Sequence, residues 1–137
     1  MEGTPHITLT RWLVGQYEER ELALASAEDL DEAIRSIVDE DSVVLWLAAG
    51  DHALAVAASH GDLTVMVQLG DDEFYDLVGE ATAHGTFEMG QGGQWVDVPC
   101  RHRVSLPAAI HAAHTFFETG TVDVSRDTWE RQGRTAL

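Results

Sequence analysis

The sequence predicts an α+β fold, a single domain over residues 1–137 whose largely antiparallel sheet carries two amphipathic helices on one face. Two patterns predict this fold. Apolar residues recur at three- and four-residue spacing in two segments, which begin near Ser26 and Ser105. The other apolar stretches are short, rich in β-branched and aromatic residues, and separated by glycine-containing turns. Strands joined by tight turns pair antiparallel, and two helices suffice to cover one face of such a sheet.

Two strands and a helix are expected first. Residues 6–14 alternate between two sets of side chains, as a strand does, and a turn at Gly15-Gln16 leads to a second strand at residues 21–25. Ser26 then caps a helix, because its hydroxyl can accept a hydrogen bond from a free amide of the first turn. The apolar residues of this helix fall on one face: Leu30, Ala33, Ile34, Ile37 and Val38.

A three-stranded meander follows, over residues 43–47, 52–59 and 62–69. Two-residue hairpin signals, Gly50-Asp51 and His60-Gly61, separate the strands. The first strand is a continuous apolar run, which is typical of a strand covered on both faces. Small side chains line one side of the middle strand, where we expect them to let a helix approach closely: Ala53, Ala55 and Ala57.

Three more strands and the second helix complete the chain. The strands are expected at residues 74–78, 86–89 and 94–99, the last of them stopped by Pro99. Ser105 caps the helix, and Gly120 ends it because glycine enters the left-handed region without steric cost. The buried stripe is formed by Leu106, Ala109, Ile110, Ala113, Phe116 and Phe117.

The charge of the chain is strongly negative and unevenly distributed. There are 24 carboxylates against 8 basic residues, all of them arginine, for a formal net charge of −16. Residues 1–100 hold 20 Asp or Glu and three Arg, whereas residues 101–137 hold four and five. Such a field repels phosphate backbones and attracts a basic protein, so we do not expect direct nucleic-acid binding. The alternative is that the surplus serves solubility alone.

Motifs for catalysis are missing. A zinc deaminase needs a second cysteine after Pro-Cys-x-x, but Pro99-Cys100 is followed by Arg-His-Arg. There is no Gly-x-Ser-x-Gly elbow and no phosphate-binding Walker loop. His111 and His114 lie one helical turn apart and could form half a metal site, but no third ligand is indicated, which favours polar-face histidines. We therefore predict no catalytic residue, no metal and no cofactor.

No segment suggests a membrane or a disulfide framework. No apolar run approaches the roughly 20 residues that cross a bilayer, and the N-terminus has no secretory signal. Cys100 is the single cysteine. We expect a soluble, cytoplasmic protein.

The C-terminal part resembles the Imm1 family of bacterial immunity proteins. The features that carry the resemblance are an aromatic strand ending at Gly79, a glycine-flanked tryptophan strand that ends in proline, an alanine- and phenylalanine-rich helix with a Thr-Gly stop, and a closing tryptophan. They occupy residues 75–79, 92–99, 104–113, 116–120 and 129–130. The hinge Arg101-His102-Arg103 departs from the family pattern, because it is more basic than expected.

The resemblance implies a protein that binds and neutralises a toxin made by the same cell. In such a family the toxin is often a nucleic-acid deaminase, and its active site is covered by the immunity protein. The expected partner is a cognate toxin with a basic substrate groove, which the acidic surplus fits. The alternative is a non-catalytic module that binds a small ligand or forms a homodimer, as the aromatic strand and glycine loop would allow.

Carboxylates and aromatic residues around strand 74–78 and its neighbours are the predicted contacts: Asp71, Asp72, Glu73, Tyr75, Asp76, Glu80, Glu88, Trp95 and Asp97. The alternative for the acidic run is a solvated turn followed by a charge-protected edge strand. Val96 and Val98 favour a core role for Trp95 instead. A core role is also expected of the other three tryptophans, Trp12, Trp46 and Trp129.

Overall fold

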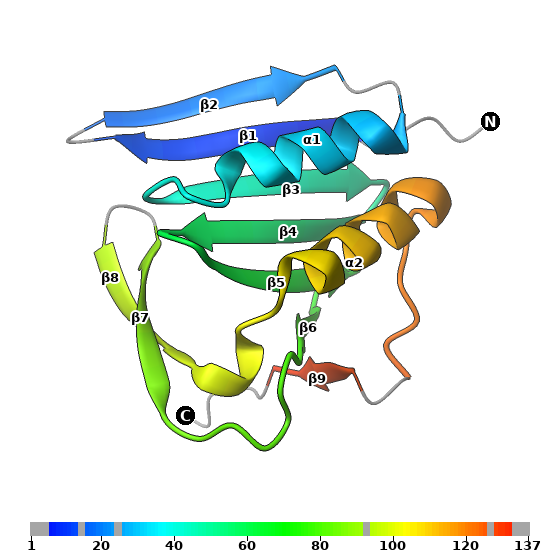
Figure 1. The fold of residues 1–137 in the computed structure, drawn as a ribbon. Coiled ribbons are helices and arrows are strands. Elements are labelled where there is room, and N and C mark those ends of the chain that lie inside the picture. Colours follow the sequence, from blue (N-terminus) through cyan, green and yellow to red (C-terminus); the bar gives the residue numbers. More distant parts are fainter. Residues whose placement is uncertain (1–5, 14–15, 24–25, 92–93, 126–127, 133–137) are drawn as a thin grey trace.

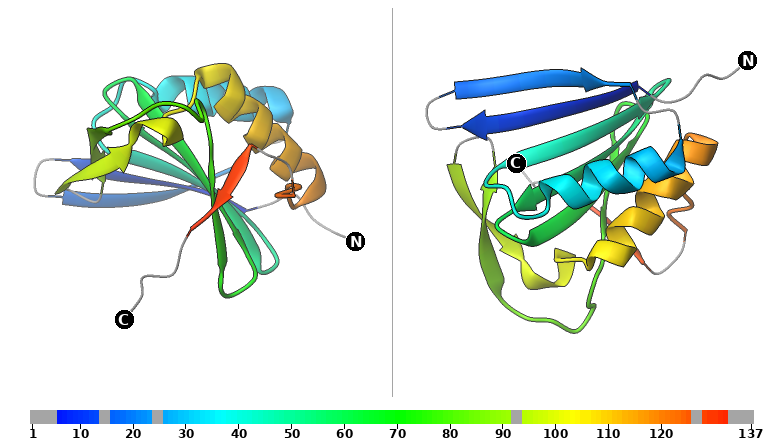
Figure 2. Two further views of the ribbon diagram at one scale, coloured as in Figure 1. Left: turned by 90° about the horizontal axis from the view of Figure 1, so that it is seen from below. Right: turned by 45° about the horizontal axis from the view of Figure 1, so that its top comes forward.

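The computed structural model describes residues 6–13, 16–23, 26–91, 94–125 and 128–132. Its main element is a seven-stranded antiparallel sheet with the strand order β2-β1-β3-β4-β5-β6-β9 (Figure 1). The strands are β1 (His6–Leu13), β2 (Gln16–Leu22), β3 (Val43–Ala49), β4 (His52–Ser59), β5 (Asp62–Leu69), β6 (Glu73–Leu77) and β9 (Trp129–Arg131). Helices α1 (Ala27–Ile37) and α2 (Leu106–Thr119) lie on the same face of this sheet (Figure 2). The predicted α+β fold is confirmed.

The core lies between this face and the two helices. Rows of paired residues cross the central strands, and each row is almost fully buried: Leu47, Leu54 and Val67, then Leu45, Val56 and Val65, then Val43, Ala58 and Leu63. The helices contribute Leu30, Ile34, Ile37, Ala109, Ala113 and Phe116 to the same cluster. Large aliphatic side chains fill this layer, because close packing of apolar surface is what stabilises it.

The alanines of β4 are not under a helix, so that prediction is wrong. Ala53, Ala55 and Ala57 alternate with Leu54 and Val56, which belong to the core between sheet and helices. They therefore lie on the opposite face. Both sets are apolar, and the larger aliphatic side chains are the ones that fill the space beneath the helices.

The predicted helix ends are confirmed by their hydrogen bonds. The hydroxyl of Ser26 accepts from the amide of Asp29 at 3.2 Å, and that of Ser105 accepts from the amide of Ala108 at 3.2 Å. Gly120 has a φ of 78°, and its amide donates to the carbonyl of Phe116 at 2.7 Å. In the described part of the chain, neither helix is long and apolar enough to span a bilayer.

Three strand predictions need correction. The second strand spans Gln16–Leu22 rather than residues 21–25, because an edge strand tolerates the charged residues 18–21 on its exposed surface. Strand β9 was not predicted, since three residues carry no periodic signal. Strands β7 (Thr86–Gln91) and β8 (Gln94–Pro99) form a separate two-stranded sheet instead of joining the main one.

The β7–β8 hairpin and the following 3₁₀ turn η1 (Cys100–His102) pack against the end of the main sheet. The amide of Gly90 donates to the hydroxyl of Ser59 at 3.0 Å, and Thr64 contacts the sulfur of Met89 at 3.9 Å. Ser59 and Thr64 alternate with side chains that face the helices. The hairpin therefore closes part of the sheet face that the helices leave open, at the end where β4 turns into β5.

Candidate partner-binding surface

An exposed tryptophan with two carboxylates occupies one face of the hairpin. Trp95 is 60% exposed, and Tyr17 is the other large apolar side chain found exposed in the described residues. Glu88 and Asp97 are direct cross-strand partners and are both exposed. Side chains of paired residues share a face, so these carboxylates lie beside the tryptophan. The predicted core role of Trp95 is wrong.

The opposite partner of Trp95 explains its position. Trp95 pairs with Gly90, whose backbone approaches the β4–β5 turn so closely that an added Cβ would lie 3.2 Å from the hydroxyl oxygen of Ser59. This close approach brings the indole over the ring of His60, with centroids 5.9 Å apart and an interplanar angle of 15°. The contact is therefore a stacked pair between the hairpin and the turn.

His60 is held from two sides. Its Nε2 lies 2.9 Å from Oδ1 of Asp41, and its backbone amide donates to the carbonyl of Glu40 at 2.7 Å. His60 has a φ of 50°, which is uncommon for a residue with a side chain, and Gly61 follows with a φ of 92°. These angles fit the two-residue hairpin turn that the sequence predicted.

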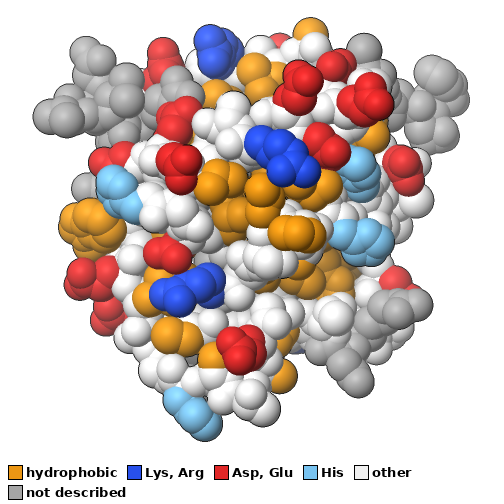
Figure 3. Space-filling model, in the orientation of Figure 1, with side chains coloured by type: hydrophobic (Ala, Val, Ile, Leu, Met, Phe, Trp, Pro, Cys, Tyr) orange, Lys and Arg blue, Asp and Glu red, His pale blue; other side chains and the backbone are white. Residues whose placement is uncertain are grey.

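We call Asp41, His60, Glu88, Trp95 and Asp97 the hairpin surface. Figure 3 shows an apolar side chain standing out between a histidine and carboxylates at the left of the molecule, where Figure 1 places the hairpin and the β4–β5 turn. Three of these residues were predicted as contacts, and the structure brings them together. Asp41 and His60 were missed, because no local sequence signal places the α1–β3 link beside the β4–β5 turn.

The other predicted acidic contacts lie elsewhere. Asp71 and Asp72 are exposed in the β5–β6 turn, which antiparallel pairing places at the opposite end of β5 from the β4–β5 turn. Glu73 accepts a hydrogen bond from the hydroxyl of Tyr75 at 3.1 Å, and Tyr75 packs against the core. The predicted contact residues are thus divided between two ends of the sheet.

Asp76 belongs to a partly buried cluster with Arg101, His102 and Glu130, which we call the Glu130 cluster. His102 is 9% exposed, with Nε2 2.7 Å from Oε1 of Glu130 and Nδ1 3.9 Å from Oδ2 of Asp76. Arg101 donates two hydrogen bonds to the carboxylate of Glu130, of 2.9 and 3.1 Å. The cluster joins β6, η1 and β9.

The two carboxyl groups of the Glu130 cluster have opposite pKa shifts. Burial raises the pKa of Asp76, and the nearby His102 opposes that shift. Hydrogen bonds from Arg101, and then from His102, lower the pKa of Glu130 to about 2. Glu130 is therefore the negatively charged group at the centre of the cluster, and its charge is paired with Arg101 of the same chain.

The basic hinge that departs from the family pattern is thereby explained. Arg101 and His102 bind Glu130, and Arg103 pairs with Asp62 at 3.2 Å while its guanidinium lies 4.1 Å from the ring centroid of Phe87. These contacts anchor the link between hairpin and α2 to three separate elements. The hinge therefore serves the fold.

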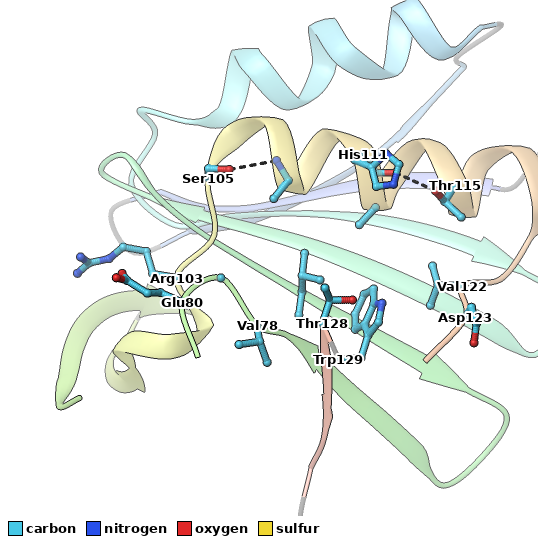
Figure 4. A pocket seen from close by; sticks show the side chains of 14 residues that line it. Val78, Glu80, Arg103, Ser105, His111, Thr115, Val122, Asp123, Thr128 and Trp129 are labelled. Carbon is cyan, nitrogen blue, oxygen red and sulfur yellow. Dashed lines mark hydrogen bonds between the residues drawn. The ribbon is translucent and has the colours of Figure 1, made fainter. Parts of the chain in front are cut away.

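An open cleft of about 680 Å³ lies between α2, the end of β6 and residues 122–123 and 128–129 (Figure 4). Its floor is apolar, with Leu77, Ala112, Val122 and Trp129. Its rim is polar, with Glu80, His111, Thr115 and Asp123. Figure 4 shows Glu80 beside Arg103 at one end and Asp123 at the other.

The histidines of α2 do not act as a pair. His111 lines the cleft, whereas Nε2 of His114 is hydrogen-bonded to Oδ1 of Asp31 on α1. Among the residues that the structure describes, no group of three or more His, Cys, Asp or Glu is placed to hold a metal ion. Of the remaining tryptophans, Trp129 packs against the core, Trp46 is half-buried on the open sheet face, and the side chain of Trp12 lies outside the described part.

An acidic α+β domain with an exposed aromatic anchor is the kind of protein that binds another macromolecule. The family model described as immunity protein Imm1 matches residues 18–128. The chain therefore belongs to the Imm1 family of immunity proteins, which are non-catalytic and neutralise toxins by binding them. The match extends to residue 18, well before the C-terminal segments that carry the resemblance in the sequence. A search of curated proteins found no match to this chain.

Proposed function

We propose that this immunity protein neutralises its toxin by covering the toxin's active site with an acidic surface, and that the toxin is a deaminase acting on nucleic acid. The observation that carries the proposal is the hairpin surface, where an exposed indole and three carboxylates lie together on a chain of net charge −16.

The chemistry of a nucleic-acid-directed toxin supports this mechanism. A toxin that acts on DNA or RNA needs a cationic groove to hold phosphates. Carboxylates can occupy such a groove, because arginine and lysine form charge-assisted hydrogen bonds with them as they do with phosphate. Opposite net charges also raise the association rate, which favours capture of the toxin before it reaches its substrate.

The predicted contact residues take two roles in this proposal. Glu88, Trp95 and Asp97 form the contact itself, since they share one exposed face. Asp71, Asp72, Glu73 and Glu80 add to the field that steers the toxin, and Tyr75 and Asp76 support the fold.

Co-expression with the toxin domain encoded beside this gene tests the function. We expect the chain to restore growth, to suppress deaminated bases in the cell's nucleic acid, and to co-purify with the toxin. Growth arrest in the presence of the chain, without a complex on purification, would contradict the proposal.

A competition experiment tests occlusion of the active site. A catalytically inactive toxin is loaded with a single-stranded oligonucleotide substrate, and the immunity protein is titrated in. Occlusion predicts that the oligonucleotide is released as the protein complex forms. A stable ternary complex would show that the toxin is gripped at a remote surface.

Binding of a small ligand is the second candidate, and the cleft beside α2 is the observation that favours it. Its volume of about 680 Å³ and its apolar floor are typical of ligand sites. A ligand bound there would raise the melting temperature of the isolated chain, and Ala112→Leu should abolish that shift by filling the floor. A metabolite screen without any such shift would remove this candidate.

A further inference from the structure

We infer that Trp95, stacked on His60, is a preformed anchor that inserts into the toxin and receives an arginine of the toxin's basic groove between its indole and the surrounding carboxylates. This inference rests on the proposed function, and it names the centre of the contact and the side chain that the partner supplies.

Exposure of Trp95 is the first argument. An indole that is 60% exposed leaves much of its apolar area in water, and burying that area is favourable by roughly 25 cal/mol per Å². The fold does not use the area, since the core of the main sheet is complete without Trp95. Tryptophan is also among the residues that most often dominate interface energies.

Preorganisation is the second argument. The stack on His60 restricts the indole, and His60 is itself fixed by Asp41 and by the hydrogen bond that its backbone amide donates to the carbonyl of Glu40. The backbone amide of Gly61 donates a further hydrogen bond of 2.8 Å to the carbonyl of Val38. An anchor already held in place loses less side-chain freedom on binding, so more of its contact energy becomes affinity.

The flanking charges define the partner. Asp41 lies at the base of the stack, and Glu88 and Asp97 stand on the same hairpin face as the indole. A guanidinium group can lie on an aromatic ring and at the same time form paired hydrogen bonds with a carboxylate. Lysine offers a point charge without the planar fork, so arginine fits this arrangement better.

The test measures binding of the inactive toxin domain encoded beside this gene to purified variants. Trp95→Ala should weaken binding by about 30-fold or more, as expected for an interface hot spot. His60→Asn should weaken it by about 5- to 10-fold, because Asn-Gly keeps the hairpin turn while the stacking ring is lost. Tyr17→Ala is the matched control, since it removes an exposed aromatic side chain on β2 and should change binding less than twofold.

The outcomes separate this inference from the proposed function. Tight binding by the wild type with an unchanged affinity for Trp95→Ala would overturn the anchor and leave the proposed function intact. No binding by the wild type would overturn the proposed function. If Trp95→Ala melts early, Trp95→Thr keeps the strand propensity and must show the same loss of affinity.

Discussion

Two clusters in this protein each place a histidine beside carboxylate groups, one at the surface and one partly buried. In the hairpin surface, His60 bonds to Asp41 and stacks on Trp95, and its side chain is 57% exposed. In the Glu130 cluster, His102 lies between two carboxylates, and its side chain is 11% exposed. Each histidine joins segments that are far apart in the sequence.

Burial decides what each cluster can do. A pair as exposed as His60 and Asp41 contributes about 0–1 kcal/mol to folding, so its carboxylate can be shared with a partner at little cost. A partly buried cluster must keep its charges matched, because removal of one member leaves another charge without compensation. We therefore propose that the hairpin end binds the toxin, whereas the contacts at the β6–β9 end stabilise the fold.

The charge distribution agrees with this division. Arg101 and Arg103, both in the C-terminal part, pair with carboxylates of the same chain. The acidic surplus remains in the first 100 residues, which contain all five residues of the hairpin surface.

The largest expected effect is a loss of folding stability when the packing against the hinge is disturbed. Gly79→Ala should lower the free energy of unfolding by about 3 kcal/mol or more, because the added Cβ would lie 2.0 Å from the carbonyl oxygen of Arg103. Gly50→Ala is the control: it meets open space, and its φ of 63° costs about 1 kcal/mol. Urea unfolding measures both. Equal losses would show that the packing of the hinge is not tight.

Substitution of His102 and of His60, each in its own variant, should separate the effect on stability from the effect on binding. His102→Ala should cost about 2–3 kcal/mol of unfolding free energy, since Glu130 and Asp76 lose a partly buried partner. His60→Asn should change that free energy by less than about 0.5 kcal/mol. Thermal denaturation followed by circular dichroism checks both values. A greater loss from His60→Asn would break the comparison.

Lowering the pH should reveal the contribution of the Glu130 cluster to folding stability. A carboxyl group whose folded pKa is lowered stabilises the fold above its unfolded pKa, and this contribution disappears as the pH falls from about 4.5 to about 2. After solvent screening we expect Glu130 to account for about 1–2 kcal/mol. Asp76 acts in the opposite sense, because its raised pKa means that protonation favours the folded state.

The matched variant for this prediction is Glu130→Gln. It should be less stable than the wild type at pH 6 and should lose less stability between pH 4.5 and 2. Urea titrations at several pH values provide the measurement. Parallel pH profiles for the two proteins would show that Glu130 carries no such linkage.

The smallest expected effect concerns steering. Glu88→Lys and Asp97→Lys should each slow association with the inactive toxin about three- to tenfold at low salt, and the difference should shrink at high salt. Asp71→Lys, at the other end of β5, is the control and should slow it less. Stopped-flow mixing across a salt series checks this. Association rates that do not change with salt concentration would contradict electrostatic steering.

Local patterns in the sequence predicted much of the fold. Periodicity identified both helices, and serine and glycine marked their ends at Ser26, Ser105 and Gly120. Strand β9 escaped prediction because it depends on pairing with β6 and on the bonds to Glu130, which are long-range contacts. The offset of β2 has the same origin, since an edge strand takes its register from β1.

The candidate site was predicted only in part, because its assembly also depends on long-range contacts. Glu88, Trp95 and Asp97 were identified by residue type, but the valines beside Trp95 suggested a core position. Trp95 stacks on His60 where Gly90 approaches Ser59, and no local pattern reveals these long-range contacts. Asp41 and His60 join the site through tertiary contacts alone.

Hydrogen–deuterium exchange of the chain, alone and bound to its inactive toxin, can locate the toxin contact on this protein. We predict slower exchange on binding in residues 39–42, 59–62, 86–91 and 94–99. Residues 74–78 and 129–131 should exchange at the same rate in both states. Protection confined to the β6–β9 end would contradict the assignment of the toxin contact to the hairpin surface.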